Sequence, residues 1–265
     1  VPFTLSTMSI CSIEKVAKNT SKPFWFQLYV MKDHDFAKRL VERAKAAECS
    51  ALVLTLDLQI LGQRHADIRN GLSVPMKIKM SNVFDLISKP KWCFEMVRSK
   101  NRTFGNIMGH VKDIKNLTSL TKWVQSQFDP KLNWDDVKRI KDWWGGKLII
   151  KGIMDPDDAK MAQKCGADAL VVSNHGGRQL DGVNSSISML PQIKKAISGI
   201  EVLLDSGISS GQDILKAIAL GAEGVMIGRS FVYGLSAKGK KGVKNALEIL
   251  NKELDMTMAL CGRRD

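Results

Sequence analysis

The stretch CGADALVVSNHGGRQLD, residues 165–181, contains the pattern that decides the fold. Its apolar run 169–172 is short and bounded by glycines on both sides, which is typical of a fully buried strand rather than a helix. A polar, glycine-rich turn follows and holds His175 three residues before Arg178. A base and a fixed cation at the end of a buried strand suit proton abstraction beside a bound anion, with a solvated loop as the alternative.

The same unit recurs along the chain: a helix, a Gly-Ala step, an apolar strand and a polar strand end. One copy ends at Ser173, and a second runs from Gly221-Ala222 to Gly228-Arg229. Repeated strand–helix units imply parallel strands, and polar residues at each strand end predict a (β/α)8 TIM barrel, with a doubly wound open sheet as the second choice. Seven strands are expected, at 3–8, 24–30, 51–57, 147–152, 169–172, 201–207 and 224–229.

Several helices carry local start and stop signals. Ser12, Asn133 and Asp155 occupy N-cap positions before apolar-periodic segments, and Gly145 lies where the helix 134–144 should end. We expect further helices at 33–49, 188–197, 211–220 and 242–260.

The composition fits one domain spanning residues 1–265, the usual size of such a barrel. The five cysteines show no Cys-x-x-Cys spacing and indicate thiols in a reducing compartment, with neither disulfides nor a metal site. We expect no membrane-spanning segment and no signal peptide.

The formal net charge of +13 is concentrated in a long basic insertion, residues 72–128, which interrupts the strand–helix rhythm. It contains ten lysine and arginine residues against three acidic ones. No nucleic-acid motif accompanies them, so we expect no nucleic-acid partner. A segment this long inside a domain is usually functional, and it is our candidate for contact with a membrane; a lysine-rich surface without function is the alternative.

The order of motifs resembles one known family, the FMN-dependent α-hydroxy-acid dehydrogenases and oxidases. The turn SNHGGRQLDG at 173–182 resembles its active-site signature, and FQLYV at 26–30, LTLD at 54–57, LGQR at 61–64, KG at 151–152 and IGR at 227–229 follow in the family's order. The insertion and the segment 127–134 most resemble the bacterial quinone-linked L-lactate dehydrogenase branch.

The resemblance implies that FMN is the cofactor and assigns residues to it. Residues at strand ends would contact FMN: Ser6, Gln27, Thr55 and Ser173. The loops after the last two strands would surround its phosphate: Asp205, Ser206, Gly207, Ile208, Ser209, Gly228 and Arg229. Without the resemblance, Ser6 and Thr55 fit ordinary hydroxyl residues at strand ends as well as they fit cofactor contacts.

The resemblance also implies the catalytic set. Lys151 would lie at the flavin edge where negative charge collects on reduction. Arg64 and Arg178 would bind the substrate carboxylate, and Tyr29 the substrate oxygen. His175 would accept a proton, and Asp57 would stabilise the imidazolium. In isolation, Arg64 is by default a surface residue. His34 and His110 receive no role.

The implied activity is the oxidation of L-lactate to pyruvate, with electrons passed to a membrane quinone. The resemblance also implies that the protein is either peripherally bound to the cytoplasmic face of the inner membrane or located in the cytoplasm. It further implies that the complete protein is a homo-oligomer. An oxygen-using 2-hydroxy-acid oxidase and an inactive remnant that at most binds flavin are the alternatives.

Two departures from the family pattern stand out. The first barrel strand of the family has no counterpart in this sequence, and neither do the flavin and substrate contacts near that strand. We therefore expect an incomplete barrel that contains the family's strands 2–8, with the basic insertion after the family's fourth strand. The phosphate loop has Ser209 where the family usually has arginine. Loss of a charged hydrogen bond would weaken FMN binding by about 1.5–3 kcal/mol.

Overall fold

The computed structural model describes residues 2–60, 62–71, 79–99, 101, 103–111 and 117–264. Within α6, the side chains of residues 117, 118, 121, 122 and 125 are outside this description. The chain divides into two compact units, Val1–Ile149 and Ile150–Asp265. The strand order follows the sequence from β1 to β7, as expected for a fold of successive strand–helix units.

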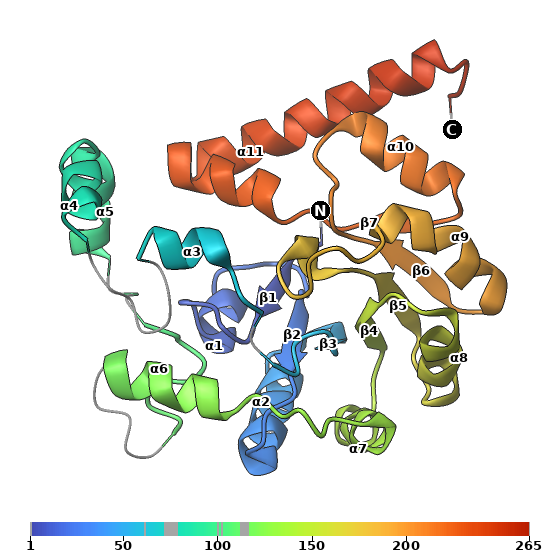
Figure 1. Cartoon of the computed structure of the whole chain (residues 1–265), viewed down its shortest axis with the longest axis horizontal. Coiled ribbons are helices and arrows are strands. Elements are labelled where there is room, and N and C mark those ends of the chain that lie inside the picture. Colours follow the sequence, from blue (N-terminus) through green and yellow to red (C-terminus); the bar gives the residue numbers. More distant parts are fainter. Residues whose placement is uncertain are drawn as a thin grey trace. The chain divides into compact units, whose positions relative to one another are not determined.

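The first unit is built on three short parallel strands, β1 (Thr4–Ser6), β2 (Trp25–Tyr29) and β3 (Ala51–Thr55) (Figure 1). Trp25 of β2 pairs with Thr4 on one side and Ala51 on the other. Every residue of β3 is buried, which is the pattern of a strand covered on both faces.

The helices around these strands begin where the sequence predicted. α1 (Ile13–Ala17) is capped by Ser12, and α2 (His34–Ala46) by Asp33. α7 (Trp134–Trp144) starts with a capping box between Asn133 and Asp136 and ends at Gly145, whose φ is +66°. α2 buries its apolar face and packs on β2 and α7.

The predicted basic insertion contains several helices. α3 (His65–Arg69) precedes it, and α4 (Met80–Ile87), α5 (Pro90–Arg98) and α6 (Leu117–Ser126) lie within it. Five of its ten basic residues lie outside the described residues: Lys77, Lys100, Arg102, Lys112 and Lys115. The side chain of Lys122 is not described either.

The described part of the insertion is not uniform. α4 and α5 contain no buried residue, whereas Asn106 and Ile107 are fully buried. The Asn106 side chain accepts from the Ile13 amide at 2.9 Å and donates to the Ser6 and Thr7 carbonyls. This part of the insertion is therefore structural, because it satisfies backbone groups at the end of β1.

The second unit begins within β4 (Leu148–Ile153) and continues the strand–helix alternation. Its further strands are β5 (Ala169–Val172), β6 (Glu201–Leu204) and β7 (Gly224–Val225). β5 pairs with β6 and β6 with β7, all parallel. Its helices are α8 (Pro156–Lys164), α9 (Ser186–Ala196), α10 (Gly211–Ala219) and α11 (Arg229–Leu260), and a short 3-10 turn, η1 (His175–Gly177), follows β5.

The end of the chain differs from the prediction. β7 is two residues long rather than six, although the Met226 amide still bonds to the Leu204 carbonyl at 2.8 Å. α11 begins at Arg229 rather than at residue 242, and it changes direction at Lys238-Gly239. A Cβ on Gly234 would lie 2.5 Å from the Gly242 carbonyl oxygen, so both glycines are needed where the two halves of α11 meet.

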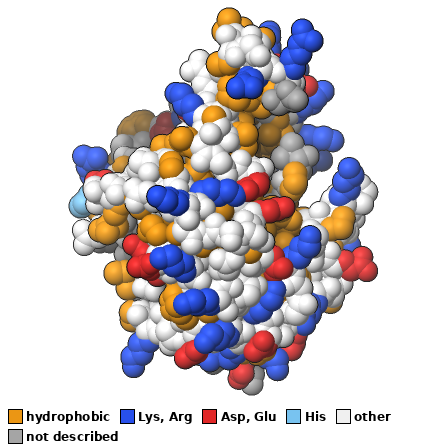
Figure 2. Space-filling view, turned by 90° about the vertical axis from the view of Figure 1, so that its right-hand side faces the viewer, with side chains coloured by type: hydrophobic (Ala, Val, Ile, Leu, Met, Phe, Trp, Pro, Cys, Tyr) orange, Lys and Arg blue, Asp and Glu red, His pale blue; other side chains and the backbone are white. Residues whose placement is uncertain are grey.

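In the part of the chain that the structure describes, no helix is both long enough and apolar enough to cross a membrane. On the face in Figure 2, lysine and arginine side chains are scattered and mixed with acidic ones. On that face the positive charge forms no continuous basic surface of the kind that binds nucleic acid.

Candidate functional site

In the first unit, three predicted cofactor residues form a hydrogen-bonded row across the neighbouring strands β1, β2 and β3. The Ser6 hydroxyl donates to Gln27 Oε1 at 2.9 Å, and Gln27 Nε2 donates to Thr55 Oγ1 at 3.0 Å. Gln27 and Thr55 are buried. The strand register brings these residues together: Ser6, the last residue of β1, lies opposite Gln27 in the middle of β2, and Thr55 is the last residue of β3, two residues beyond the Val53 that pairs with Gln27.

The other three predicted residues of this unit follow the same strand ends. Tyr29 is the last residue of β2, and Asp57 lies two residues beyond β3. Arg64 is the residue that precedes α3. All three are half-buried.

In the second unit, an ion pair links β4 to the residue that follows β6. Lys151 Nζ lies 2.8 Å from Asp205 Oδ2 and donates to Ser173 Oγ at 2.6 Å. The side chains of Lys151 and Asp205 are 14% and 17% exposed, so the pair is only weakly screened by solvent. The sequence predicted all three residues as site residues, and the structure brings them into contact.

The predicted base lies in a strained turn next to this pair. The backbone φ of His175 is +56°, a left-handed conformation that residues other than glycine rarely adopt, and Gly176 and Gly177 follow with positive φ. The His175 amide donates to Ser173 Oγ at 3.1 Å. Strained backbone of this kind is concentrated at functional sites.

Arg229 touches the same turn. Its Nη2 donates to the Gly176 carbonyl at 3.2 Å, and a Cβ on residue 176 would lie 2.9 Å from that nitrogen. The turn thus contains glycine where the arginine approaches most closely. Arg178 follows η1 and is exposed.

The predicted phosphate loop, 205–209, is held at its end by hydrogen bonds to Asp213. The amide and hydroxyl of Ser209 donate to Asp213 Oδ2 at 3.0 and 3.1 Å, and Ser210 makes matching bonds as the N-cap of α10. Burial opposes ionisation of Asp213, but these hydrogen bonds prevail and lower its pKa. A Cβ on Gly207 or Gly228 would meet nothing within 4 Å, which leaves open space beside both backbones.

Ser186 supports this loop, although the sequence does not predict it as a site residue. This buried residue in the first turn of α9 donates its hydroxyl to the carbonyls of Asp205 at 2.6 Å and Ser206 at 3.0 Å. The local pattern marks Ser185 instead, which does cap α9 by accepting from the Ser188 amide. No sequence signal distinguishes Ser186, because its partners lie 19 and 20 residues away.

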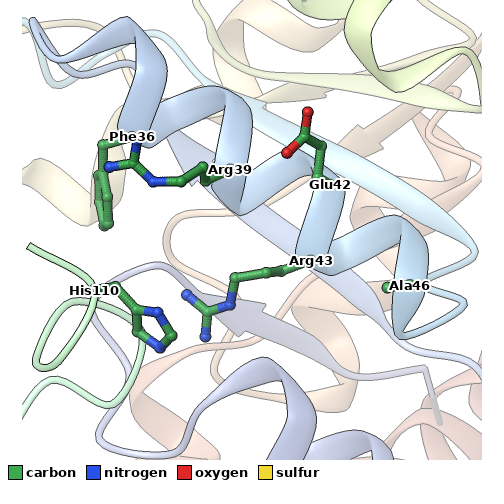
Figure 3. Close-up of a pocket in the computed structure, with 6 residues that line it drawn as sticks. All are labelled: Phe36, Arg39, Glu42, Arg43, Ala46 and His110. Carbon is green, nitrogen blue, oxygen red and sulfur yellow. The ribbon is translucent and has the colours of Figure 1, made fainter.

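A cavity of about 390 Å³ in the first unit lies apart from the predicted residues. Figure 3 shows Arg43 on α2 pointing toward His110, with Arg39 beside Phe36 and Glu42 pointing away. Burial and the Arg43 charge lower the pKa of His110. Arg43 is already paired with Glu14, at 2.7 Å, and Arg39 Cζ lies 5.6 Å from the centroid of the Phe36 ring. The cavity contains none of the predicted site residues, so we do not assign it to the reaction.

The chain belongs to the FMN-dependent dehydrogenase family, whose sequence model matches residues 1–265. Among individual relatives, it is 47% identical to an L-lactate dehydrogenase of Haemophilus influenzae and 44% identical to one of Acinetobacter baylyi. Both alignments cover 100% of this chain; the chain spans 70% of the first relative and 69% of the second.

Two solved structures confirm the fold of an incomplete (β/α)8 barrel. The monotopic membrane protein (S)-mandelate dehydrogenase superposes with a TM-score of 0.92 at 37% identity, covering 99% of this chain and 69% of its own. Mandelate oxidase superposes with a TM-score of 0.80 at 36% identity, covering 99% and 66%.

FMN is the cofactor of this family, and the residues present fit it. The first unit offers buried amide and hydroxyl groups of Gln27 and Thr55, which match the carbonyl and N–H edge of a flavin. The second unit offers a lysine ammonium, which suits the flavin edge that gains negative charge on reduction, and open backbones at Gly207 and Gly228, which an anionic phosphate can approach.

Proposed function

We propose that the chain oxidises a 2-hydroxy acid, L-lactate, to the 2-keto acid, pyruvate, with FMN. The observation that carries this proposal is the strained His175 turn held beside the Lys151–Asp205 pair. A base next to a fixed cation is the chemistry that the reaction requires. Relatives named L-lactate dehydrogenase at 44–47% identity support lactate as the substrate.

The residues of the chain divide the work between binding and proton transfer. His175 accepts the proton that the hydroxy acid loses, and Asp57 stabilises the resulting imidazolium. Arg64 and Arg178 bind the planar carboxylate, and Tyr29 binds the substrate oxygen. Bound FMN supplies the two-electron acceptor. Lys151 would stabilise the flavin edge that gains negative charge on reduction, and the pair with Asp205 orients its ammonium.

The cofactor contacts are proposed for each unit in turn. In the first unit, the flavin contacts are Ser6, Gln27 and Thr55. In the second unit, the flavin contact is Ser173. The phosphate is bound by groups of the second unit, which at Ser206 are backbone groups: Asp205, Ser206, Gly207, Ile208, Ser209, Gly228 and Arg229. The free backbone space at Gly207 and Gly228 supports this assignment.

Anaerobic flavin bleaching tests the proposal. The purified chain is incubated with FMN, separated from free FMN and mixed with L-lactate without oxygen. We expect a bound-flavin spectrum that bleaches with L-lactate and stays unchanged with D-lactate. A protein that retains no flavin at high FMN, or flavin that L-lactate does not bleach, would establish the inactive alternative.

The electron acceptor separates the dehydrogenase from an oxidase. The likeness to mandelate oxidase favours oxygen as a second candidate, whereas the L-lactate dehydrogenases and (S)-mandelate dehydrogenase favour another acceptor. We propose a membrane quinone. A soluble quinone analogue should reoxidise the bleached flavin much faster than air-saturated buffer; faster reoxidation by oxygen would assign an oxidase.

The α4–α5 hairpin supports a peripheral membrane contact. The two helices pack on each other and expose large apolar side chains that a water-facing surface rarely gathers. They are Met80, Val83, Phe84, Leu86 and Ile87 of α4, and Trp92, Phe94, Met96 and Val97 of α5. Lys79, Lys89, Lys91 and Arg98 accompany them. Apolar and basic side chains together suit an anionic bilayer surface.

Vesicle co-sedimentation tests this contact. Phe84 and Ile87 are each 69% exposed, so the double variant Phe84→Asp/Ile87→Asp should fold normally and lose binding to anionic vesicles. Ile249→Asp on α11, where the side chain is 57% exposed, is the matched control and should bind as the parent does. Equal binding by all three proteins would contradict the proposed membrane contact.

A further inference from the structure

Two site residues of the second unit have left-handed backbones although neither is glycine. The backbone φ is +56° at His175 and +72° at Ser206. Such a conformation is unfavourable for a residue with a side chain, so contacts around it must hold it in place. The two residues are linked, because the amide of Gly176, next to His175, donates to Ser206 Oγ at 2.9 Å.

The contacts that hold the His175 turn are of two kinds. The first kind is local: the His175 amide donates to Ser173 Oγ, and the Gly177 amide donates to both Oδ1 and the carbonyl of Asn174. Local contacts of this kind travel with the turn and do not fix where it lies. Contacts from other segments do fix it: Ser206 accepts from the Gly176 N–H, Arg229 donates to the Gly176 carbonyl, and Asn174 Nδ2 donates to the Asn184 carbonyl at 3.3 Å.

The hydrogen-bond directions at Ser206 follow from the chemistry of its partners. An amide N–H can only donate, so Ser206 Oγ accepts from Gly176. The Ser206 proton is then directed to Asp205 Oδ1, 2.7 Å away. The other carboxylate oxygen of Asp205 pairs with Lys151. A continuous series of hydrogen bonds therefore runs from Lys151 to the backbone of the turn that contains the base.

Ser206 is itself held in place by Ser186. The buried Ser186 hydroxyl lies within hydrogen-bonding distance of the carbonyls of both Asp205 and Ser206. It thereby fixes the two peptide groups that flank the strained φ of Ser206. Without this contact, relaxation of Ser206 would turn its hydroxyl away from Gly176.

We propose that Ser206 is a positioning residue: its hydroxyl holds the His175 turn, rather than the cofactor phosphate. Both hydrogen-bonding roles of the hydroxyl are already in use, one toward Gly176 and one toward Asp205. The proposal rests on the proposed function only in naming His175 as the base. Displacement of a catalytic group by about 1 Å can reduce the rate about 100-fold, so the contact bears directly on turnover.

The test compares two serine-to-glycine variants of the same loop. Ser206→Gly removes the hydroxyl and keeps a residue that adopts positive φ without strain. Ser210→Gly removes a hydroxyl that bonds Asp213 instead, and glycine is tolerated at that N-cap. Thermal unfolding establishes that both variants fold.

The first readout needs no cofactor and no activity. The chain has four histidines, so the His175 imidazole resonances can be assigned by comparison with His175→Gln. In Ser206→Gly, the amide of Gly176 should exchange with solvent at least about tenfold faster and the His175 resonances should shift. Ser210→Gly should leave both at parental values. An unchanged Ser206→Gly, or an equal change in Ser210→Gly, would overturn the proposal.

The second readout separates positioning from cofactor binding. In the FMN-loaded protein, Ser206→Gly should lower kcat by about 10- to 100-fold while KM for L-lactate and Kd for FMN stay within about twofold. A weakened Kd with unchanged kcat would return Ser206 to the phosphate site and overturn the proposal. If the parent protein shows no turnover, the proposed function fails, and the exchange measurement still decides the role of Ser206.

Discussion

At the scale of single residues, the site depends on where one imidazole lies. His175 has a left-handed backbone and neighbours a lysine–aspartate pair that is largely shielded from solvent. The sequence predicted the residue and its chemistry, because a histidine in a glycine-rich turn after a buried strand is a recognisable pattern. The strain and the contacts from Ser206 and Ser186 could not be predicted, because their partners lie 19 to 30 residues away.

Replacing the base tests its role directly. His175→Gln should lower turnover with L-lactate by about 10²- to 10⁴-fold, because a general base contributes a factor of that size. FMN binding should be unchanged, since glutamine keeps a polar side chain of similar length. Stopped-flow bleaching measures the rate. His110→Gln, which alters an exposed histidine at the separate cavity, should behave as the parent; equal losses in both variants would contradict the assignment.

Restoring the arginine of the family pattern tests the phosphate loop. Ser209→Arg should tighten FMN binding by about 1.5–3 kcal/mol, the contribution of a charged hydrogen bond. The gain is partly offset because the Ser209 hydroxyl gives up its bond to Asp213. Quenching of FMN fluorescence gives the Kd. Ser209→Gln is the uncharged control; an equal gain in both variants would show that charge is not the cause.

At the scale of elements, the termini signalled by polar caps were predicted well. Ser12, Asn133 and Asp155 cap α1, α7 and α8 as expected. The largest error is in the last helix, which was expected only from residue 242, whereas α11 starts at Arg229 and bends at Lys238-Gly239. A glycine required for close contact looks the same in a sequence as one that ends a helix.

An ion pair between α1 and α2 predicts a pH dependence of stability. Arg43 bonds both carboxylate oxygens of Glu14, at 2.7 and 3.0 Å, and lowers the pKa of Glu14 from 4.5 to about 2. A carboxyl whose folded pKa is depressed stabilises the fold above its unfolded pKa and loses that contribution as the pH falls toward the folded value. The Glu14 side chain is 47% exposed, so screening limits the contribution to about 1 kcal/mol.

Arg43→Met should remove this dependence. The difference in unfolding free energy between parent and variant should shrink by about 1 kcal/mol from about pH 6 to about pH 3. Urea denaturation at both pH values measures it. Lys38→Met, at an exposed position on the same helix, is the control and should show no such change. A constant difference for Arg43→Met would mean that the pair does not contribute.

At the scale of the whole molecule, the fold is that of a barrel family member lacking part of its relatives' length. The chain spans 70% of the L-lactate dehydrogenase of Haemophilus influenzae, and the sequence predicted the seven strands in their observed order. Strand order followed from the repeat of strand–helix units. The buried role of Asn106 inside the basic insertion was not predicted, because a single asparagine in a loop carries no local signal.

Cofactor binding should stabilise the molecule as a whole. FMN at about 100 times its Kd should add about 2.7 kcal/mol to the unfolding free energy, which raises Tm by roughly 5–10 °C for a chain of this size. Riboflavin, which lacks the phosphate, should stabilise much less at the same concentration. Thermal denaturation with each ligand measures the difference. Equal shifts would show that the loop at 205–209 does not bind the phosphate.

The turn at Gly176 has a consequence for mutational tolerance. Position 176 disfavours other residues for two reasons: its φ is +69°, and a Cβ would lie 2.9 Å from Arg229 Nη2, so that the arginine side chain would have to move. Gly177, with φ +71°, has open space around its Cβ position. A saturation library should therefore tolerate asparagine or aspartate at 177 far better than at 176. The residue under the tightest constraint in this turn is then one that has no side chain and takes no part in the chemistry.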